Sequence, residues 1–437
     1  MPNTGRPREK DPIYERWRWQ IFGVTWLAYA GLYLTRKGFS VAKVAIGPDT
    51  LIGLSKGQMA AIDTAYNVAY ALGQFVFGIG GDRLGTRRVI LAGMLVSSLA
   101  GAAMGFSSTA LMFGIFFGIQ GLVQATGWAP LTKNVSHFFS RGERGTIMGL
   151  WCTNYALGGF LATNFAGTMG DAFGWRYAFW VPACVLPLIW LLFLLFQRDR
   201  PEDVGLPSIE DYHGEPQTVL DKNETPEEEP AGSWKVVWEV ISHPVVLLLG
   251  AVYFCLKPIR YLFLFWGAQY MHEKLGTGLA GSALISSAFE LGGPVGALVG
   301  GWISDRVFGS RRVPVCVISL LALGGLIFFF DDLPANMWII GGCFALMGAF
   351  TYAADSLVTG TAAVDFGSKK GASTSAGLIN GFGSIGQIIG AALPGIVPAA
   401  WDWSNIFAVL AVAALFAALL MFPKWNALPD PAPEAAR

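Results

Sequence analysis

The sequence predicts an all-α membrane protein with twelve transmembrane helices in two six-helix, pseudo-symmetric halves. Three observations lead to this fold class. The 437 residues are 53% hydrophobic and 14% charged, whereas a soluble domain carries about 25% charged residues. Apolar runs recur at lengths that match a bilayer core, which needs about 20 residues per helix. Charged motifs of the first half return in the second half at a nearly constant interval.

Twelve apolar runs are expected to cross the membrane. Those of the first half cover about residues 19–35, 58–80, 88–107, 110–134, 146–168 and 176–196. Those of the second half cover about residues 244–271, 279–303, 313–331, 336–364, 372–398 and 403–422. Arg36 and Lys37 follow the first run without a small-residue cleavage pattern, so we expect a retained helix rather than a signal peptide.

Basic residues mark alternate connections, and this bias sets the orientation of a membrane protein. The N-terminal segment and the stretches DRLGTRR, SRGER, QRDR, DRVFGSRR and GSKKG are basic. The connections between them are short and poor in Lys and Arg, with Lys43, Lys56, Arg176 and Lys274 as the main exceptions. Both termini are therefore expected in the cytoplasm.

The expected organisation has five parts. They are a cytoplasmic N-terminal segment (1–18), a six-helix half (19–196), a cytoplasmic linker (197–240), a second six-helix half (241–423) and a cytoplasmic tail (424–437). The linker contains the acidic, proline-bracketed stretch TPEEEP, a composition typical of a disordered spacer.

Several classes of function are excluded by what the sequence lacks. The formal net charge of zero argues against a nucleic-acid partner. The five cysteines all fall in apolar runs and form no CxxC or Cys/His cluster, so neither disulfides nor a metal site are expected. No nucleophile lies beside a base, and no glycine-rich phosphate loop follows a strand, so we expect neither an enzyme nor a bound cofactor.

The two halves repeat each other. GIGGDRLGTRR follows the second run and GGWISDRVFGSRR follows the eighth, which places Asp82 and Asp305 223 residues apart. Arg36 in the first run and Arg260 in the seventh are 224 residues apart. Two equivalent arginines in parallel repeats are typical of a transporter whose site lies between the halves.

Burying an arginine in a span costs roughly 2.5 to 3.5 kcal/mol, and such residues usually mark function. The guanidinium presents a planar fork of donors that fits phosphate oxygens. We therefore expect Arg36 and Arg260 to bind a phosphoryl group. The alternative is that each arginine is paired with an acid inside the bundle.

More specific motifs are YLTRKGF at 33–39, GWAP at 127–130, ERG at 143–145 and RDRPEDVGLPSIEDY at 198–212. With these motifs the chain resembles the major facilitator superfamily and, within it, the organophosphate:phosphate antiporters. The resemblance implies a monomeric rocker-switch exchanger of a bacterial inner membrane. It would move an organophosphate or phosphonate against inorganic phosphate, with Arg36 and Arg260 at its central site.

The resemblance also implies roles for other residues. Lys37 and Glu290 would form an ion pair that exchanges partners during transport, the alternative being a static pair. Tyr29, Tyr33, Tyr70 and Gln124 match positions near the pocket, although an aromatic residue in a membrane helix is often plain packing. Asn380 and Gln387 are seven residues apart on one helix face and are further candidates to line the substrate side.

Three departures from the best-known members bear on the substrate. Gln74 stands where those transporters have a lysine, and Tyr155 stands where some have a histidine. Lys257 and Asp355 add a cation and a carboxylate inside the seventh and tenth runs. These two either pair with each other or contact substrate, and in the second case we hypothesise a substrate other than glycerol-3-phosphate, for instance a zwitterionic one.

The paired loop motifs are expected to gate rather than to bind. Asp82, Arg83, Asp305 and Arg306 lie at the cytoplasmic ends of the second and eighth runs, where they would hold the outward-facing state.

Two other functions stay open. Glu290 and Asp355 are carboxylates that could carry protons in a proton-coupled symporter. A receptor for a sugar phosphate with the same fold is the other alternative.

Overall fold

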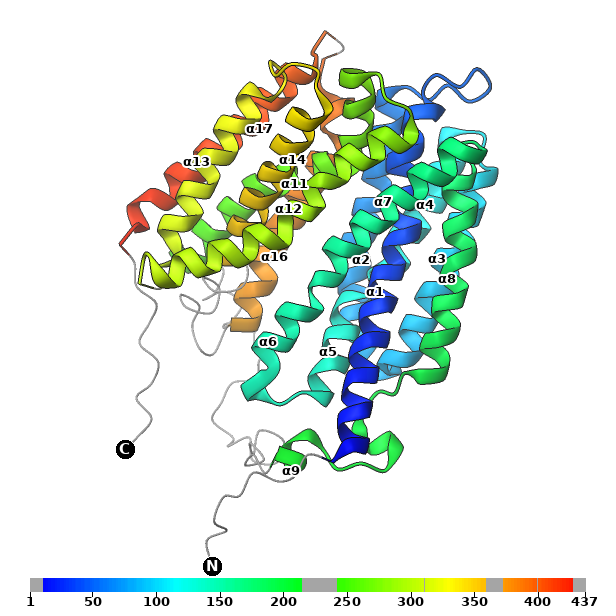
Figure 1. Ribbon diagram of the computed structural model, residues 1–437, viewed down its shortest axis with the longest axis vertical. Helices are drawn as coiled ribbons and strands as arrows, with labels where there is room; N and C mark the ends of the chain where they lie inside the picture. The colour runs from blue at the N-terminus through cyan, green and yellow to red at the C-terminus, as the bar shows by residue number, and fades with distance from the viewer. Residues whose placement is uncertain (1–10, 214–241, 310, 359–371, 399, 427–437) are drawn as a thin grey trace, which may run out of the picture.

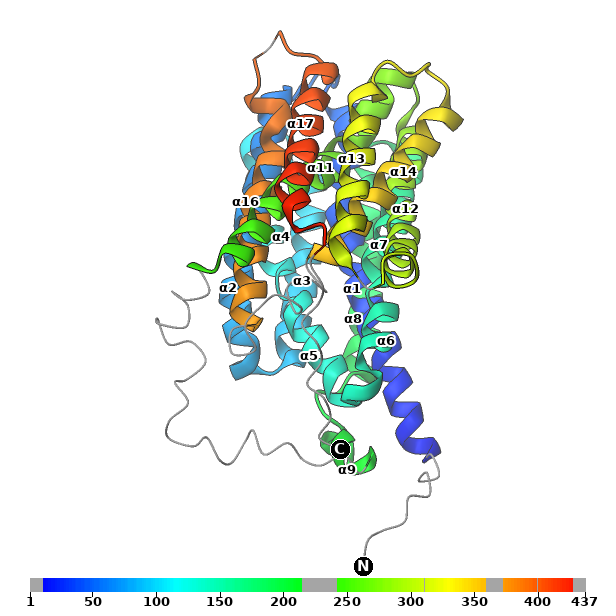
Figure 2. The same ribbon diagram turned by 90° about the vertical axis from the view of Figure 1, so that its left-hand side faces the viewer.

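The computed structural model describes residues 11–213, 242–309, 311–358, 372–398 and 400–426, and this part of the chain is helical with no strand. Figure 1 shows two groups of long helices, one from each half of the chain, and Figure 2 shows α16 (Ala372–Ile396) of the second half beside α2 (Lys56–Leu84) of the first. The two expected six-helix halves are confirmed.

The N-terminal half contains six spans. They are α1 (Pro12–Ile46), α2 (Lys56–Leu84), α3 (Thr86–Phe106), the pair α4 (Ala110–Gln124) and α5 (Trp128–Phe138), the pair α6 (Arg141–Trp151) and α7 (Thr153–Phe173), and α8 (Tyr177–Phe196). The fourth and fifth spans are each interrupted, which the apolar runs did not predict.

The C-terminal half supplies the other six. They are α11 (Pro244–Leu275), α12 (Leu279–Arg306), α13 (Arg312–Phe330), α14 (Met337–Ser356), α16 (Ala372–Ile396) and α17 (Trp403–Met421). The end of the expected run 336–364 lies outside the described residues beyond Val358.

The expected position of Lys43 in a connection is wrong. Lys43 was expected in the connection after the first span, but α1 continues to Ile46 and Lys43 is fully buried inside it. The hydrophobic run ends at Arg36 because the rest of the helix carries polar side chains toward its neighbours, not because the helix ends.

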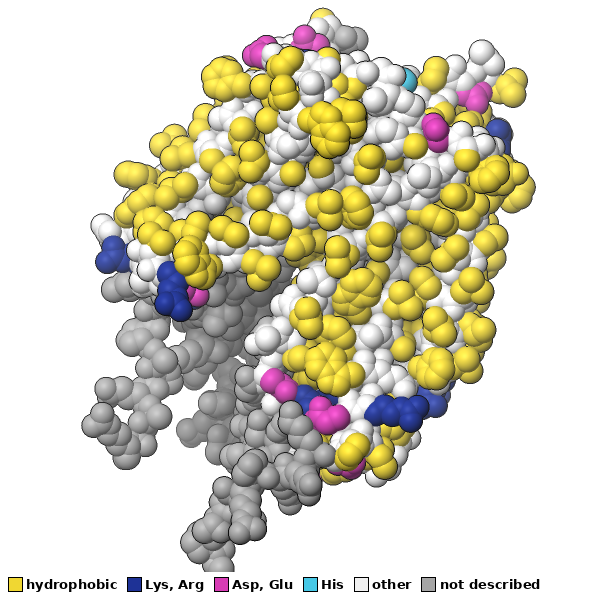
Figure 3. Space-filling model, in the orientation of Figure 1, with side chains coloured by type: hydrophobic (Ala, Val, Ile, Leu, Met, Phe, Trp, Pro, Cys, Tyr) yellow, Lys and Arg dark blue, Asp and Glu magenta, His cyan; other side chains and the backbone are white. Residues whose placement is uncertain are grey.

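The surface matches a bilayer environment. Hydrophobic side chains cover the middle of the face in Figure 3, while Lys, Arg, Asp and Glu gather toward its two ends. Within the described part, eight helices are long and apolar enough to cross a membrane by length and composition alone. The spans formed by α1, α2, α6 with α7, and α16 are not among those eight and complete the twelve.

Close helix packing in the C-terminal half depends on small residues. Gly292 and Gly296 are one helical turn apart on α12. A Cβ on Gly292 would overlap the backbone carbonyl of Ala345 on α14, and a Cβ on Gly296 would overlap that of Ala349. Glycines at this four-residue spacing let helix backbones approach closely in membranes.

The two halves meet at one end of the bundle. We call the end where α1 begins and α17 finishes the near end, and the opposite one the far end. Lys56 at the start of α2 pairs with Glu273 at the end of α11, with 2.9 Å between Nζ and Oε2. Asn67 of α2 accepts a hydrogen bond from Gln387 of α16 at 2.6 Å. All hydrogen bonds and ion pairs that the structure gives between described residues of the two halves lie at or beyond the level of Arg36, toward the far end. The halves part toward the near end (Figure 1).

The start of the expected linker is folded. After α8 the chain forms a short 3-10 turn (Pro201–Val204) and α9 (Ile209–His213). The Tyr212 ring stacks on Tyr14 of α1 with 3.9 Å between centroids. The TPEEEP stretch, expected to be a spacer, lies outside the described residues.

Candidate functional site

Arg36 lies at the centre of the bundle, where its partner is an amide rather than a carboxylate. Its Nε donates to Oε1 of Gln124 on α4 at 2.8 Å. Its Nη2 is buried and has no hydrogen-bond partner. An unpartnered charged donor is costly in a low-dielectric interior. Arg36 therefore retains a free donor for an anion.

Gln124 is fully buried and holds Arg36 in place. Its Oε1 also accepts from the Tyr66 hydroxyl at 2.9 Å. Its Nε2 donates to the Leu32 carbonyl, to Thr35 and to Ser97. The side-chain amide is thus surrounded by protein partners, and it positions Arg36 instead of facing the pocket.

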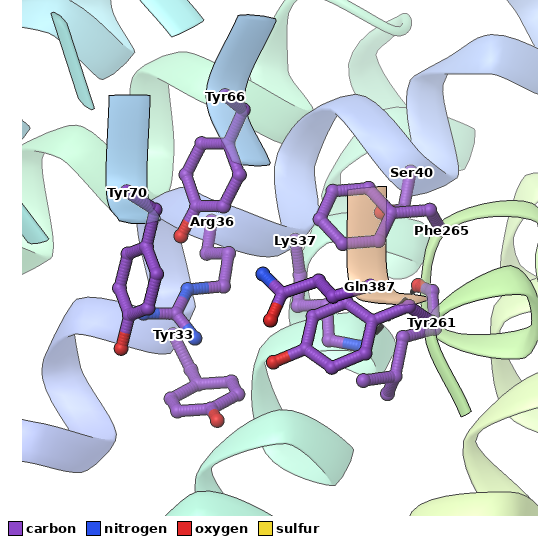
Figure 4. Close-up of a pocket in the computed structure, with 10 residues that line it drawn as sticks. Tyr33, Arg36, Lys37, Ser40, Tyr66, Tyr70, Tyr261, Phe265 and Gln387 are labelled. Carbon is purple, nitrogen blue, oxygen red and sulfur yellow. Dashed lines mark hydrogen bonds between the residues drawn. The ribbon is translucent and has the colours of Figure 1, made fainter. Parts of the chain in front are cut away.

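Aromatic rings enclose the Arg36 guanidinium. Its central carbon lies 4.4 Å from the centroid of the Tyr33 ring and 5.2 Å from that of Tyr70. Figure 4 shows these rings, together with those of Tyr66 and Tyr261, around a pocket that Gln387 also lines. Cation–π contact lets the rings stabilise the charge while their hydroxyls stay available as hydrogen-bonding groups.

Arg260 occupies the equivalent place in the other half but is paired. Its Nη1 donates to Oδ2 of Asp355 on α14 at 2.7 Å, and its Nη2 donates to the Tyr352 hydroxyl at 3.1 Å. The guanidinium carbon lies 5.5 Å from the Tyr155 ring, which stacks on Tyr352. Its Nε is buried without a hydrogen-bond partner. One donor of Arg260 therefore remains free although the side chain has a counter-ion.

Lys37 and Glu290 form an ion pair between the halves. Lys37 Nζ lies 2.9 Å from Glu290 Oε1, and both side chains are almost wholly buried. Gly159 of α7 makes room for the carboxylate, because a Cβ there would overlap Glu290 Oε1. The expected exchange of partners during transport stays a prediction.

Lys257 is not paired with Asp355. The aspartate is occupied by Arg260, whereas the structure gives Lys257 no ion pair with any described residue. Its Nζ lies 4.6 Å from the centroid of the Tyr253 ring and 5.4 Å from that of Tyr261. Tyr261 lines the pocket around Arg36, so the Tyr261 ring lies between Lys257 and that pocket.

Other expected site residues lie elsewhere. Tyr29 packs on Trp128 and Trp151, away from the pocket lining. Gln74 is exposed on α2 and Asn380 is exposed on α16, and neither lines the pocket.

The residues of the paired loop motifs lie at the ends of their helices, away from the pocket. Asp305 accepts a hydrogen bond from Arg312 of its own half. Arg306 is exposed at the end of α12, and the side chains of Asp82 and Arg83 lie outside those described.

The sequence reasoning missed several tyrosines and a buried ion pair. Tyr253, Tyr261 and Tyr352 surround the cations of the second half. The repeat held a signal for one of them, since the interval of 224 residues between the arginines also separates Tyr29 from Tyr253. Lys43 and Asp63 form a fully buried pair near the pocket, and no sequence feature had joined them.

The arrangement suits anion binding. Arg36 and Arg260 each keep a free donor, they project from different halves, and the carboxylates around them are already engaged. The described residues contain no group of three or more His, Cys, Asp or Glu that could hold a metal ion.

Comparisons with known proteins identify the family of the chain. The family model described as Major Facilitator Superfamily matches residues 25–283 and 259–437. A probable hexose phosphate transport protein of Chlamydia trachomatis is 30% identical over 422 residues, covering 95% of this chain and 92% of the relative. Membrane sensor protein UhpC of Salmonella typhimurium is 30% identical over 429 residues, covering 96% of this chain and 94% of the relative.

A solved structure supports the fold. A bacterial homologue of the human lysosomal transporter Spinster, in an inward-facing and unoccupied conformation, superposes with a TM-score of 0.72. The two chains are 15% identical, and the match covers 95% of this chain and 96% of the other.

Proposed function

Because the chain belongs to the Major Facilitator Superfamily, a family of membrane transporters rather than enzymes, we propose that it exchanges an organophosphate or phosphonate for inorganic phosphate. Arg36 and Arg260 bind the phosphoryl group, and the two halves rock about it so that the site opens to one side of the membrane at a time. The name of the relative from Chlamydia trachomatis points to the same class of substrate.

The observation that carries the proposal is the pair of free arginine donors. Arg36 Nη2 and Arg260 Nε are buried and without a hydrogen-bond partner, and the two side chains come from equivalent positions of the two halves. Phosphate oxygens are the acceptors that such donors fit best. Binding one anion between them would draw the halves together, which couples occupancy to the change of conformation.

The near end faces the cytoplasm in this proposal, with both termini on that side of a bacterial inner membrane. The described contacts between the halves lie toward the far end, so this conformation admits substrate from the cytoplasm. Residues 19–196 and 241–423 move as the two bodies, joined by the linker 197–240, and the protein acts as a monomer.

Proteoliposomes loaded with inorganic phosphate test the exchange. Uptake of labelled phosphate by the native protein should require internal phosphate, and Arg36→Lys and Arg260→Lys should each reduce it at least about a hundredfold, because lysine cannot present the fork of donors. Lys424→Gln, at the end of the last helical turn among the described residues, should leave uptake unchanged. Uptake that persists without internal phosphate and follows a proton gradient would point instead to a symporter.

A second candidate function rests on the relative from Salmonella typhimurium, which is named as a membrane sensor protein. In that case the same arginines would bind a sugar phosphate and the conformational change would signal without transport. Folded protein that binds phosphate compounds but exchanges none in vesicles would favour the sensor.

A further inference from the structure

The charges around the site do not balance. Apart from the Lys43–Asp63 pair, whose charges cancel, the described side chains near the pocket include four cations, Arg36, Lys37, Lys257 and Arg260, and two carboxylates, Glu290 and Asp355. The site therefore carries two positive charges in excess.

Each of the two carboxylates already has a cationic partner. Asp355 Oδ2 accepts from Arg260 at 2.7 Å, and Glu290 Oε1 lies 2.9 Å from Lys37 Nζ. The two cations left without a carboxylate are Arg36, which has only the Gln124 amide, and Lys257. Lys257 lies within electrostatic range of Asp355 and Arg260, but it forms no ion pair with them.

Lys257 lies beside the pocket, next to a ring that lines it. It lies one turn before Arg260 and Tyr261 on α11, and its ammonium lies near the Tyr261 ring that lines the pocket beside Arg36. Gly383 of α16 leaves space for its stem, since a Cβ there would come within 3.2 Å of Lys257 Cγ. On α14 the charged group facing it is Asp355, and on α11 it is Arg260.

An uncompensated charge in a low-dielectric interior is strongly unfavourable. A ligand with two negative charges removes the excess, whereas a monoanion leaves one cation without a counter-charge. An ammonium group on the ligand would have to compete with Arg260 for Asp355 or with Lys37 for Glu290. The tyrosine hydroxyls around the pocket instead offer hydrogen bonds to a neutral, hydroxylated remainder.

Building on the proposed function, we propose that Lys257 is a specificity-determining residue that makes the site select a doubly charged phosphoryl group attached to a neutral remainder. This inference replaces the zwitterionic substrate suggested by the sequence, because Asp355 is engaged by Arg260.

Three ligands of nearly equal size test it at pH 8. Ethylphosphonate can bind there as a dianion, since its second proton leaves near that pH, whereas its monomethyl ester is a fixed monoanion and 2-aminoethylphosphonate adds an ammonium group. Dissociation constants are measured on purified, detergent-solubilised full-length protein by calorimetry, with ligand-dependent thermal unfolding as a second readout. The variants are Lys257→Gln, Lys257→Arg and Lys424→Gln.

The native protein should bind ethylphosphonate at least about tenfold more tightly than the monoester, because one additional charge pair gives about that factor even at a separation of about 10 Å and an effective dielectric of about 20. Lys257→Gln should reduce that ratio by about tenfold, while Lys257→Arg and Lys424→Gln keep it. 2-Aminoethylphosphonate should bind the native protein more weakly than ethylphosphonate does.

A native ratio near one, an unchanged ratio in Lys257→Gln, or 2-aminoethylphosphonate binding as tightly as ethylphosphonate would each overturn the inference. If vesicles still exchange phosphate in that case, the proposed function stands and only the role of Lys257 fails. If folded native protein binds no phosphonate at all, both fail. The unfolding midpoint without ligand shows whether each variant is folded.

Discussion

Gln124 bonds Arg36 and does not line the pocket, so we propose that it acts on substrate through Arg36. Its carbonyl oxygen accepts from both Arg36 Nε and the Tyr66 hydroxyl, and its amide group is fully used by other protein atoms. The sequence placed it in the pocket because a position near an arginine does not tell whether a side chain faces the ligand or the back of the arginine.

Replacing Gln124 with methionine should weaken phosphate binding without preventing folding. The change leaves Arg36 Nε and the Tyr66 hydroxyl without a buried acceptor, a loss worth about 1 to 3 kcal/mol. The half-saturating phosphate concentration in exchange assays should rise about tenfold or more. Gln120→Met is the matched control, because Gln120 is as buried on the same helix but bonds the Ser97 carbonyl rather than Arg36. Equal effects of the two changes would rule out the positioning role.

Gly159 is a second residue whose role appears only in three dimensions. Gly159→Ala should disrupt the Lys37–Glu290 pair, because the new methyl group would overlap the carboxylate. Exchange should fall about tenfold or more, since breaking a buried pair leaves uncompensated charge. Gly149→Ala is the control, as a Cβ there meets nothing within 4 Å. Full activity of Gly159→Ala would mean that the pair is not needed for transport.

How far the site could be predicted differs from residue to residue. Arg36 and Arg260 were identifiable because a buried arginine is costly and because the repeat placed both at one interval. Tyr261 and Tyr352 were not, since a tyrosine in an apolar run looks the same whether it packs or lines a pocket. The pairing of Asp355 with Arg260 rather than Lys257 depends on how α14 faces α11, and spacing along the chain does not encode that.

Helices α1 and α2 share a buried ion pair that also contacts the other half of the protein. Lys43 of α1 pairs with Asp63 of α2, and its Nζ donates to the Phe265 carbonyl of α11 at 3.0 Å. The ammonium also lies 4.0 Å from the Trp266 ring. One side chain thus connects three helices from both halves. The apolar runs predicted the existence of these helices well but not their ends, because polar side chains buried between helices resemble a connection in sequence.

Removing one member of this pair should destabilise the protein strongly. Lys43→Met or Asp63→Leu alone leaves a buried charge without its partner, at a cost of about 3 to 5 kcal/mol, whereas the double variant should recover most of that loss. Thermal unfolding midpoints of the native protein, both single variants and the double variant measure the effect. Losses that simply add in the double variant would mean that the two side chains do not act as a pair.

For the whole molecule, the contacts at the far end are those that must separate if the site is to open there. Lys56 and Glu273 bridge the halves at that end, and the Trp403 indole donates to the same glutamate at 2.6 Å. The sequence predicted two halves and a site between them, but repeats define the halves without saying which end is closed in a given conformation.

Linking those two positions should stop transport. Cysteines in place of Lys56 and Glu273, joined by a short bismaleimide, should hold the far end closed and abolish phosphate exchange while phosphate binding from the near end persists. Variants that carry only one of the two introduced cysteines, and the native protein with its five cysteines, serve as controls after treatment with the same reagent. Exchange at the native rate in the linked protein would show that the halves need not separate there.

The polarity of four spans has a consequence for how the chain is made. The spans formed by α1, α2, α6 with α7, and α16 are not among the eight apolar enough to cross a membrane on their own composition, and they carry Arg36, Lys43, Asp63, Tyr70 and Gln387. We expect such segments to leave the insertion machinery less readily than the apolar ones, because a polar side chain in lipid is costly until a later helix covers it. Since α4 packs on α2 and α7 packs on α1, we expect the first two helices to stay beside the translocon until α4 and α7 have been made.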